Sequence, residues 1–209
     1  MNRLPSIVRQ HLAALRLLLA FTVICGIIYP VFMWGVAQAA FKNQADGSLV
    51  TYNGKVVGSS LLCQEFVDAK GNPLPQWFQP RPSNATSGAA NDYGCDPGYS
   101  AASNLGPNSS KLTTTVDQRK EQVATFNHVP ESAVPPDAVT ASGSGLDPDI
   151  SPQYADIQVA RVAGARHLPV ATVQTLVNKY TQGRNIGFLG EPRVDVLDLN
   201  VALSELPGQ

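Results

Sequence analysis

The chain of 209 residues has little charge of either sign. It contains 15 Lys and Arg against 16 Asp and Glu, so charged residues make up 15% of the sequence and the net charge is -1. Proteins that bind nucleic acid through its phosphates carry a basic patch or stripe, and no such excess is present here. The composition therefore indicates no nucleic-acid partner and no polybasic patch for a membrane surface.

Cysteine and histidine are also scarce, with three of each. No Cys-x-x-Cys pair and no His/Cys cluster has the spacing of a zinc site, so we expect no metal centre. Cys25 lies in an apolar segment, whereas Cys63 and Cys95 lie in the polar remainder of the chain. In an oxidising compartment these two cysteines would form a disulfide, and two unlinked buried thiols are the alternative.

Charge is wholly absent from residues 17–41. This apolar run exceeds the roughly 20 helical residues that cross a hydrocarbon core of about 30 Å. No second run of this kind follows, so the sequence predicts one transmembrane helix over residues 12–40. A signal peptide cleaved at the small-x-small sequence Ala37-Gln38-Ala39 is the alternative, although the apolar part of a signal peptide is usually about 7–15 residues long.

Basic residues lie on the N-terminal side of the apolar run. Arg3, Arg9 and Arg16 precede it without any acidic residue among them. Because positive charge beside a span is held in the cytoplasm, we expect residues 1–11 to be a cytoplasmic N-terminus. Residues 41–209 would then form one extracytoplasmic domain, and cleavage of the helix would leave that domain outside the cytoplasm as well.

The domain has the pattern of a mixed fold. The expected elements are a β-hairpin over Leu49–Val57 with Asn53-Gly54 as its turn, helices over Lys111–Asn127, Ser151–His167 and Pro169–Gly183, and a last strand over Arg193–Leu199. Ser151 is a typical N-cap with Pro152 at the first helical position. A polar, Pro-rich stretch from Asp68 to about Ser110 separates the hairpin from the helices, and loops of this length are usually functional or disordered. This order predicts the α+β class.

One short segment invites comparison with catalytic loops, namely Ser142-Gly143-Ser144-Gly145. A nucleophile elbow needs Gly-x-Ser-x-Gly, and a P-loop needs Gly-Lys-Ser/Thr, and neither pattern is present. We interpret the segment as a tight turn in which Ser142 or Asp147 caps backbone amides. An anion held by the amides of this loop is one alternative. A second is an anchored serine hydrolase that uses Ser142 or Ser144.

The domain offers no other catalytic arrangement at the level of sequence. His128 and His167 are its only histidines, and neither lies in a recognisable acid–base pattern. No pair of carboxylates has a spacing that indicates glycosidase chemistry. From the residues alone, the chain is an anchored domain without visible enzyme machinery.

Several longer segments match a known family nearly from end to end. They are Tyr29-Pro30, Gly58–Phe66, Trp77–Ser83, Ser103–Asn108, Val139–Pro152 and Gly187–Val194. In these segments the chain resembles the C subunit of the Kdp-type high-affinity potassium-transporting ATPase of bacteria and archaea. The resemblance implies a non-catalytic accessory subunit of the bacterial inner membrane, needed for assembly and activity of the pump.

The resemblance also implies partners and a nucleotide. The partners would be an ATP-hydrolysing P-type subunit, a channel-like subunit that conducts potassium, and membrane lipid. The family's C subunit is described as a catalytic chaperone that raises the ATP affinity of the hydrolysing subunit, and the matching ATP-binding positions here are Gln64, Ser103, Asn104 and Gly106. Ala101-Ala102 stands where the family usually has two glycines, which removes backbone freedom for a close approach to phosphate.

The predicted topology suggests a mechanism by contact. ATP is scarce outside the cytoplasm, so a domain on that side would act on the pump through its subunits. The helix would pack beside the channel-like subunit through small residues such as Gly26 and Gly35. The domain would then brace or gate the ion entrance.

Overall fold

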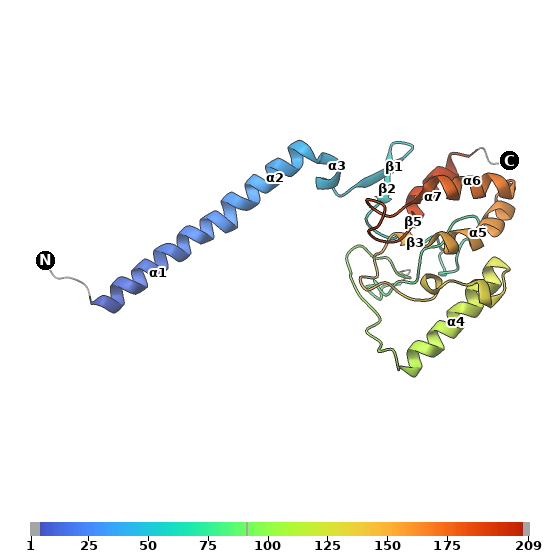
Figure 1. Cartoon of the computed structure of the whole chain (residues 1–209), viewed down its shortest axis with the longest axis horizontal. Helices are drawn as coiled ribbons and strands as arrows, with labels where there is room; N and C mark the ends of the chain where they lie inside the picture. The colour runs from blue at the N-terminus through green and yellow to red at the C-terminus, as the bar shows by residue number, and fades with distance from the viewer. Residues whose placement is uncertain (1–4, 91, 207–209) are drawn as a thin grey trace. The chain divides into compact units, whose positions relative to one another are not determined.

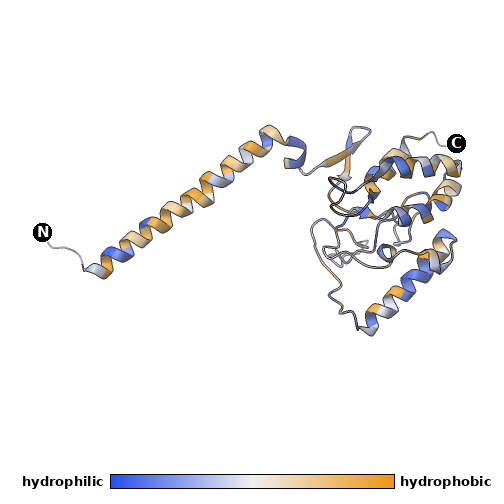
Figure 2. Cartoon of the chain, in the orientation of Figure 1, coloured by the Kyte–Doolittle hydropathy of each residue, from blue (hydrophilic) through white to orange (hydrophobic). Residues whose placement is uncertain are grey.

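The computed structural model describes residues 5–90 and 92–206, and the chain divides into two units, Met1–Ser48 and Leu49–Gln209. The first unit is helical (blue in Figure 1). Its elements are α1 (Ser6–Val23), a π-helical turn (Ile24–Ile28), α2 (Tyr29–Ala40) and the short α3 (Lys42–Ala45). The first three form one continuous helix of 35 residues that is long and apolar enough to cross a membrane (orange in Figure 2). The predicted span, residues 12–40, lies within this helix.

A proline explains the π-helical turn in the middle of the long helix. Pro30 has no N–H to donate, and its ring would clash with the carbonyl of Gly26 in a regular α-helix. The turn over Ile24–Ile28 is wider than an α-helical turn and ends two residues before the proline. The helix therefore continues through Pro30 without a break.

The second unit begins with the predicted hairpin. Strands β1 (Leu49–Tyr52) and β2 (Lys55–Ser59) pair antiparallel. Asn53 and Gly54 both have positive φ, 50° and 74°. These values are those of a two-residue type I′ turn, which matches the twist of paired strands and favours Asn-Gly. The hairpin is confirmed.

The remaining elements confirm the α+β class. The helices are α4 (Ser110–Asn127), α5 (Pro152–Ala165), α6 (Val170–Tyr180) and α7 (Val196–Ser204), with 3-10 turns at Glu131–Ala133 and Pro136–Ala138. Strands β3 (Asp149–Ile150), β4 (Thr181–Gln182) and β5 (Arg193–Asp195) form a small antiparallel sheet in the order β3-β5-β4. The Ser151 hydroxyl accepts the N–H of Tyr154 at 3.0 Å, so the predicted N-cap of α5 is confirmed as well.

The predicted last strand over Arg193–Leu199 is wrong beyond Asp195. At that point the chain begins α7, because the Asp195 carboxylate accepts the N–H of Asp198 at 2.8 Å and caps a helix. A short apolar stretch does not distinguish a strand from a buried helix by its period. The capping hydrogen bond resolves the ambiguity.

The end predicted for the preceding helix is also wrong. Helix α6 ends at Tyr180, three residues before Gly183. Thr181 and Gln182 leave the helix to pair with β5 as strand β4. The end of the helix is thus set by a strand partner more than ten residues further along the chain.

The core of the second unit combines the helices with part of the long loop. Most of its buried apolar side chains come from α5, α6, α7, β3 and β5, and these elements are grouped together in Figure 1. Phe78, in the middle of the Pro-rich stretch, is 0% exposed and belongs to the same cluster. That stretch is therefore part of the packed core.

Two buried side-chain amides hold this loop segment in place. The Asn200 amide accepts the N–H of Phe78 and donates to its carbonyl, both at 2.9 Å. The Gln158 amide accepts the N–H of Gln79 at 2.7 Å and donates to its carbonyl at 3.1 Å. Each amide takes the place of a neighbouring strand, so these buried backbone groups are satisfied although the segment belongs to no sheet.

Two arginines of α5 complete the support of this segment. Arg161 donates to the carbonyls of Pro75 and Trp77, and Arg166 donates to the carbonyl of Gln76 at 2.9 Å. The Arg166 guanidinium also lies 4.3 Å from the centre of the Trp77 ring. Burial lowers the pKa of Arg161 to about 10. At neutral pH it therefore remains a charged donor to the loop carbonyls.

We expect Asn200→Ala to destabilise the domain strongly. The N–H and carbonyl of Phe78 would be left buried without partners, at a cost of about 1–3 kcal/mol for each group. The free energy of unfolding can be measured by urea denaturation of the detergent-solubilised chain. Asn178→Ala, at an exposed position on α6, should change it by less than about 0.5 kcal/mol. Equal effects of the two substitutions would contradict this role of Asn200.

Candidate functional site

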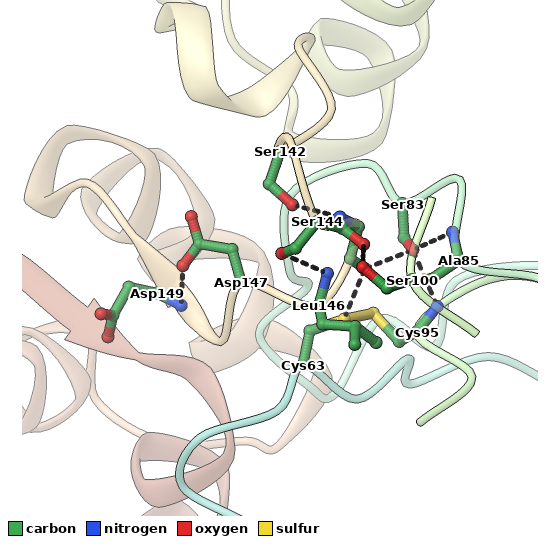
Figure 3. The surroundings of a disulfide bond; sticks show 11 residues. Cys63, Ser83, Ala85, Cys95, Ser100, Ser142, Ser144, Leu146, Asp147 and Asp149 are labelled. Carbon is green, nitrogen blue, oxygen red and sulfur yellow. Dashed lines mark hydrogen bonds between the residues drawn. A yellow bond between two sulfur atoms is a disulfide. The ribbon is translucent and has the colours of Figure 1, made fainter. Parts of the chain in front are cut away.

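The loops of the second unit meet at a disulfide. Cys63 and Cys95 are bonded, which confirms the pairing that the sequence left open. The bond joins the end of the hairpin segment to the Pro-rich loop across a sequence separation of 32 residues. Figure 3 shows serines and backbone groups of three segments around it. The disulfide is thus the covalent part of a larger loop junction.

Ser83 is the central hydrogen-bonding group of this junction. Its hydroxyl donates to the carbonyl of Gly145 at 2.6 Å and accepts the N–H groups of Ala85 and Cys95 at 3.0 and 2.9 Å. The contacts around Ser83 can be followed in Figure 3. One hydroxyl therefore joins the segments that contain Ser83, Cys95 and Gly145.

The Ser-Gly-Ser-Gly segment has the capping role that its sequence predicts. The Ser142 hydroxyl accepts the N–H of Gly145 at 2.8 Å, and the Ser144 hydroxyl accepts the N–H of Leu146 at 3.1 Å (Figure 3). Among the described residues, no hydrogen bond joins either serine to a histidine. Both hydroxyls are occupied by backbone amides, so the serine-hydrolase alternative is not favoured.

Gly145 is required by close packing. Its φ is 72°, and a Cβ at this position would lie 2.6 Å from the carbonyl oxygen of Ala101 and 2.8 Å from the nitrogen of Ala85. The neighbouring carbonyl of Ser144 accepts the N–H of Ala101 at 2.9 Å. The glycine thus allows the chain before α4 to pack against the junction.

Arg81 connects the junction to the core segment. Its guanidinium forms an ion pair with Asp147 at 2.7 Å and donates to the carbonyl of Thr140 at 3.3 and 3.4 Å. The other carboxylate oxygen of Asp147 accepts the N–H of Asp149 at 3.1 Å (Figure 3). Arg81, whose role the sequence does not indicate, therefore holds the Ser-Gly-Ser-Gly loop against the segment after Phe78.

Gln64 lies next to the disulfide and lines a cavity of about 520 Å³. It also lines a smaller cavity of about 290 Å³ beside Trp77 and Leu197. A Cβ on Gly58 would lie 2.8 Å from the Gln64 Oε1 atom and 2.7 Å from Leu197. The glycine at position 58 therefore makes room for the Gln64 amide.

The other three predicted site residues lie elsewhere. Ser103, Asn104 and Gly106 belong to an exposed segment before α4 and line neither cavity that contains Gln64. Asn104 adopts a left-handed conformation, with φ of 52°. The structure thus does not gather the four residues at one cavity.

The cavity beside Gln64 contains carboxylates that the sequence did not single out. Glu65, Asp92 and Asp96 line it together with the disulfide. Burial, with a smaller contribution from the charge of Asp92, raises the pKa of Glu65 to about 7. Gly94 lets the chain approach, because a Cβ there would lie 2.5 Å from the Glu65 Oε1 atom. No local pattern indicates this cluster, since Glu65 is far in sequence from Asp92 and Asp96.

This lining does not fit ATP. A polyphosphate needs cationic or amide donors, and negative side chains repel it. Among the residues that the structure describes, the cavity is lined by three carboxylates and by no Lys or Arg. Nucleotide binding by Gln64, Ser103, Asn104 and Gly106 stays an untested prediction.

The two histidines of the second unit lie at helix ends. His128 follows α4 and His167 follows α5, both in left-handed conformations with φ near 56°. Neither lines the cavity beside Gln64. Among the residues described, no group of three or more His, Cys, Asp or Glu is placed to hold a metal ion.

The fold and the site define the class of protein: one helix that is long and apolar enough to cross a membrane, followed by a small α+β domain whose loops are joined by a disulfide. A family model described as K+-transporting ATPase, c chain matches residues 11–205. The chain belongs to this KdpC family. It is therefore a non-catalytic accessory subunit of the Kdp potassium-transporting ATPase and not the subunit that hydrolyses ATP.

Individual relatives agree over nearly the whole length. The potassium-transporting ATPase KdpC subunit of Streptomyces avermitilis is 47% identical over an alignment of 218 positions, which covers 98% of this chain and 97% of the relative. That of Kineococcus radiotolerans is 48% identical over 96% of this chain and 95% of its own. That of Mycobacterium tuberculosis is 45% identical over 95% of this chain and 99% of its own.

We expect removal of the disulfide by Cys63→Ser/Cys95→Ser to lower the free energy of unfolding by about 2–4 kcal/mol. The unfolded chain would regain the freedom that the bond removes. Urea denaturation under non-reducing conditions measures the change, and reducing agent should destabilise the unaltered chain by a similar amount. Cys25→Ser, in the apolar helix, is the control and should leave the stability of the domain unchanged.

Glu65 should make stability depend on pH. Because its pKa rises from 4.5 in the unfolded chain to about 7 in the fold, the folded state binds the proton more tightly. The stabilisation that comes from this tighter proton binding is complete below about pH 4.5 and is lost as the pH rises through 7. Glu65→Gln keeps a neutral side chain, so its stability relative to the unaltered chain should increase from pH 5 to pH 8.

Urea denaturation at several pH values tests this expectation. Glu121→Gln removes an exposed carboxylate on α4 and is the matched control. The free energy of unfolding of this variant, relative to the unaltered chain, should not rise from pH 5 to pH 8 as it does for Glu65→Gln. A Glu65→Gln difference that stays constant from pH 5 to pH 8 would contradict the raised pKa.

Proposed function

We propose that this chain is a single-pass subunit of a bacterial inner membrane, with residues 1–11 in the cytoplasm, residues 12–40 across the membrane and residues 41–209 outside. The observation that carries the proposal is the combination of one long apolar helix with a domain whose loops are joined by a disulfide. Disulfides form and persist mainly in oxidising, extracytoplasmic compartments. The arginines before the helix indicate the same orientation.

The function that we propose is a contact function within the potassium pump. The domain contacts the ATP-hydrolysing P-type subunit and the channel-like subunit as part of their assembly, and it braces or gates the ion entrance. The junction around Cys63, Ser83 and Gly145 supports this proposal, because bonded loops present a surface of fixed shape. A preordered surface loses less conformational entropy on binding than a mobile one.

The long helix supplies the second contact in this proposal. Gly26 and Gly35 carry no side chain, and a Cβ added at either position would meet no heavy atom within 4 Å, so the helix surface is open there. Small residues let a neighbouring membrane helix approach closely. The helix would pack against the channel-like subunit at Gly26 or at Gly35, because two positions nine residues apart in a helix lie on nearly opposite sides of it. It would contact lipid over the rest of its surface.

The family resemblance implies that the subunit raises the ATP affinity of the pump. The proposed contacts with the other subunits would have this effect even if no nucleotide binds at Gln64. A subunit that favours one conformation of the pump changes the affinity of that pump for any ligand that prefers the same conformation. The acidic lining beside Gln64 supports this indirect route. We therefore propose that the subunit raises ATP affinity through protein contacts.

Truncation after Ser48 tests the proposed function. The pump assembled with residues 1–48 should lose potassium affinity and ATPase rate, since the helix remains and the domain is missing. Co-purification of the other subunits must be measured first, because loss of assembly would show only that residues 1–48 are not sufficient to assemble the complex. Unchanged potassium affinity and ATPase rate in an assembled complex would overturn the proposal.

A further inference from the structure

Glu65 also lines a second cavity, of about 260 Å³, whose wall contains cations. The wall is formed by residues of α4, by Tyr154 near the start of α5 and by the segment around Arg81. Its cationic side chains are Arg81 and Arg119. The acidic cavity beside Gln64 has no Lys or Arg in its described lining. The second cavity is called the arginine cavity below, and none of the contacts proposed above uses it.

Arg119 brings an uncompensated positive charge to this cavity. It is half-buried on α4 and donates to the carbonyl of Val139 at 3.2 Å. Within the described part of the chain it forms no ion pair. Burial lowers the pKa of Arg119, because a charge that leaves water loses solvation. A guanidinium has five N–H donors, so most of those of Arg119 are free for a negative group in the cavity.

Arg81 holds a second guanidinium against the same short segment. It donates to the carbonyl of Thr140, the residue after Val139, and forms its ion pair with Asp147. These contacts use three of its five N–H groups, so two remain. The planar fork of an arginine matches the oxygen atoms of a carboxylate or a phosphate. Two such groups on adjacent residues of one segment favour an oxyanion as the ligand.

The Tyr154 hydroxyl is a third unused donor. Tyr154 is only 4% exposed, and no residue that the structure describes forms a hydrogen bond with its hydroxyl. Among the described side chains, the one fully enclosed polar atom without a partner is Asn84 Nδ2. The hydroxyl is therefore not enclosed, and it opens on the cavity that Tyr154 lines. Burial raises the pKa of Tyr154, so the hydroxyl remains a protonated donor.

The buried amides of the wall are already occupied by the fold. The Gln79 amide donates to backbone carbonyls, and the Asn127 amide accepts from Arg161 and donates to the carbonyl of Val123. Glu65 is the one carboxylate of the described lining. Its pKa of about 7 leaves it partly protonated at neutral pH, which weakens its repulsion of an anion. The buried and half-buried donors that the fold leaves for a ligand are those of the two arginines and the tyrosine.

We propose that the arginine cavity binds a small free oxyanion, such as inorganic phosphate or a carboxylate, through Arg81, Arg119 and Tyr154. Cavities for drug-sized ligands measure about 300–1,000 Å³, so this one suits a single small group. The bound anion would join α4 to the start of α5. All the residues involved belong to the second unit, so the inference does not depend on the proposed membrane topology or subunit contacts.

Isothermal titration calorimetry of the full chain in a non-ionic detergent tests the proposal. The probes are sodium phosphate and sodium acetate, with sodium chloride keeping the ionic strength constant. We expect saturable binding of at least one probe at a single site. Binding of neither probe would overturn the proposal. Phosphate binding that appears only with anionic lipid in place of detergent would assign the group to a lipid headgroup and overturn a site for a free ion.

Two substitutions locate the site. Arg119→Gln removes a charged donor and should weaken binding about 10- to 100-fold. Tyr154→Phe removes only the hydroxyl and should weaken binding about 2- to 10-fold. Lys120→Gln removes the neighbouring charge on α4, at a position that does not line the cavity. It is the matched control and should leave the affinity unchanged.

The stability of Tyr154→Phe separates a ligand donor from a structural hydroxyl. Because the hydroxyl has no partner within the described chain, its removal should not lower the free energy of unfolding in buffer without either probe. A clear decrease would show that the hydroxyl already serves the fold and would contradict its role in binding. Affinity that is unchanged in both Arg119→Gln and Tyr154→Phe would place the anion elsewhere and overturn the proposal.

Discussion

The pairing of two side-chain amides with a loop backbone determines how the second unit is built. Asn200 and Gln158 bind the N–H and carbonyl groups of Phe78 and Gln79, so a segment outside any sheet enters the core with its polar groups satisfied. Phe78 then fills the centre of the apolar cluster, and Arg81, three residues later, reaches the Ser-Gly-Ser-Gly loop. Without the two amides the same segment would have to remain at the surface with water. The core and the loop junction are thus parts of one arrangement.

The serines and cysteines of the domain, which are the side chains closest to nucleophiles of known enzymes, have structural roles here. Ser142 and Ser144 accept backbone N–H groups, and Ser83 joins three segments through one hydroxyl. The two cysteines of the domain form a disulfide. A small domain with few helices and a long loop gains order from such bonds where apolar burial is limited. A surface fixed in this way suits a subunit that acts by contact, and it agrees with membership of a family of non-catalytic pump subunits.

The acidic cavity of the domain and the apolar helix have different proposed roles. The cavity beside Gln64 is acidic and therefore unsuited to a polyphosphate, which makes contact between subunits the simpler route to an effect on ATP affinity. The long helix has the length and hydropathy of a membrane span. In the proposed topology it would face lipid wherever it does not pack against the pump.

Local rules were sufficient for part of this architecture. The long apolar helix, the Asn53-Gly54 turn and the Ser151 cap follow from hydropathy, backbone sterics and capping within a few residues, and the sequence by itself determined them. The Cys63–Cys95 bond stood in the sequence only as one of two alternatives. Tertiary structure alone decided the end of β5, the pairing of Asn200 with Phe78 and the raised pKa of Glu65. Each of these depends on groups that the fold brings together or on a competition between strand and helix that local periodicity does not resolve.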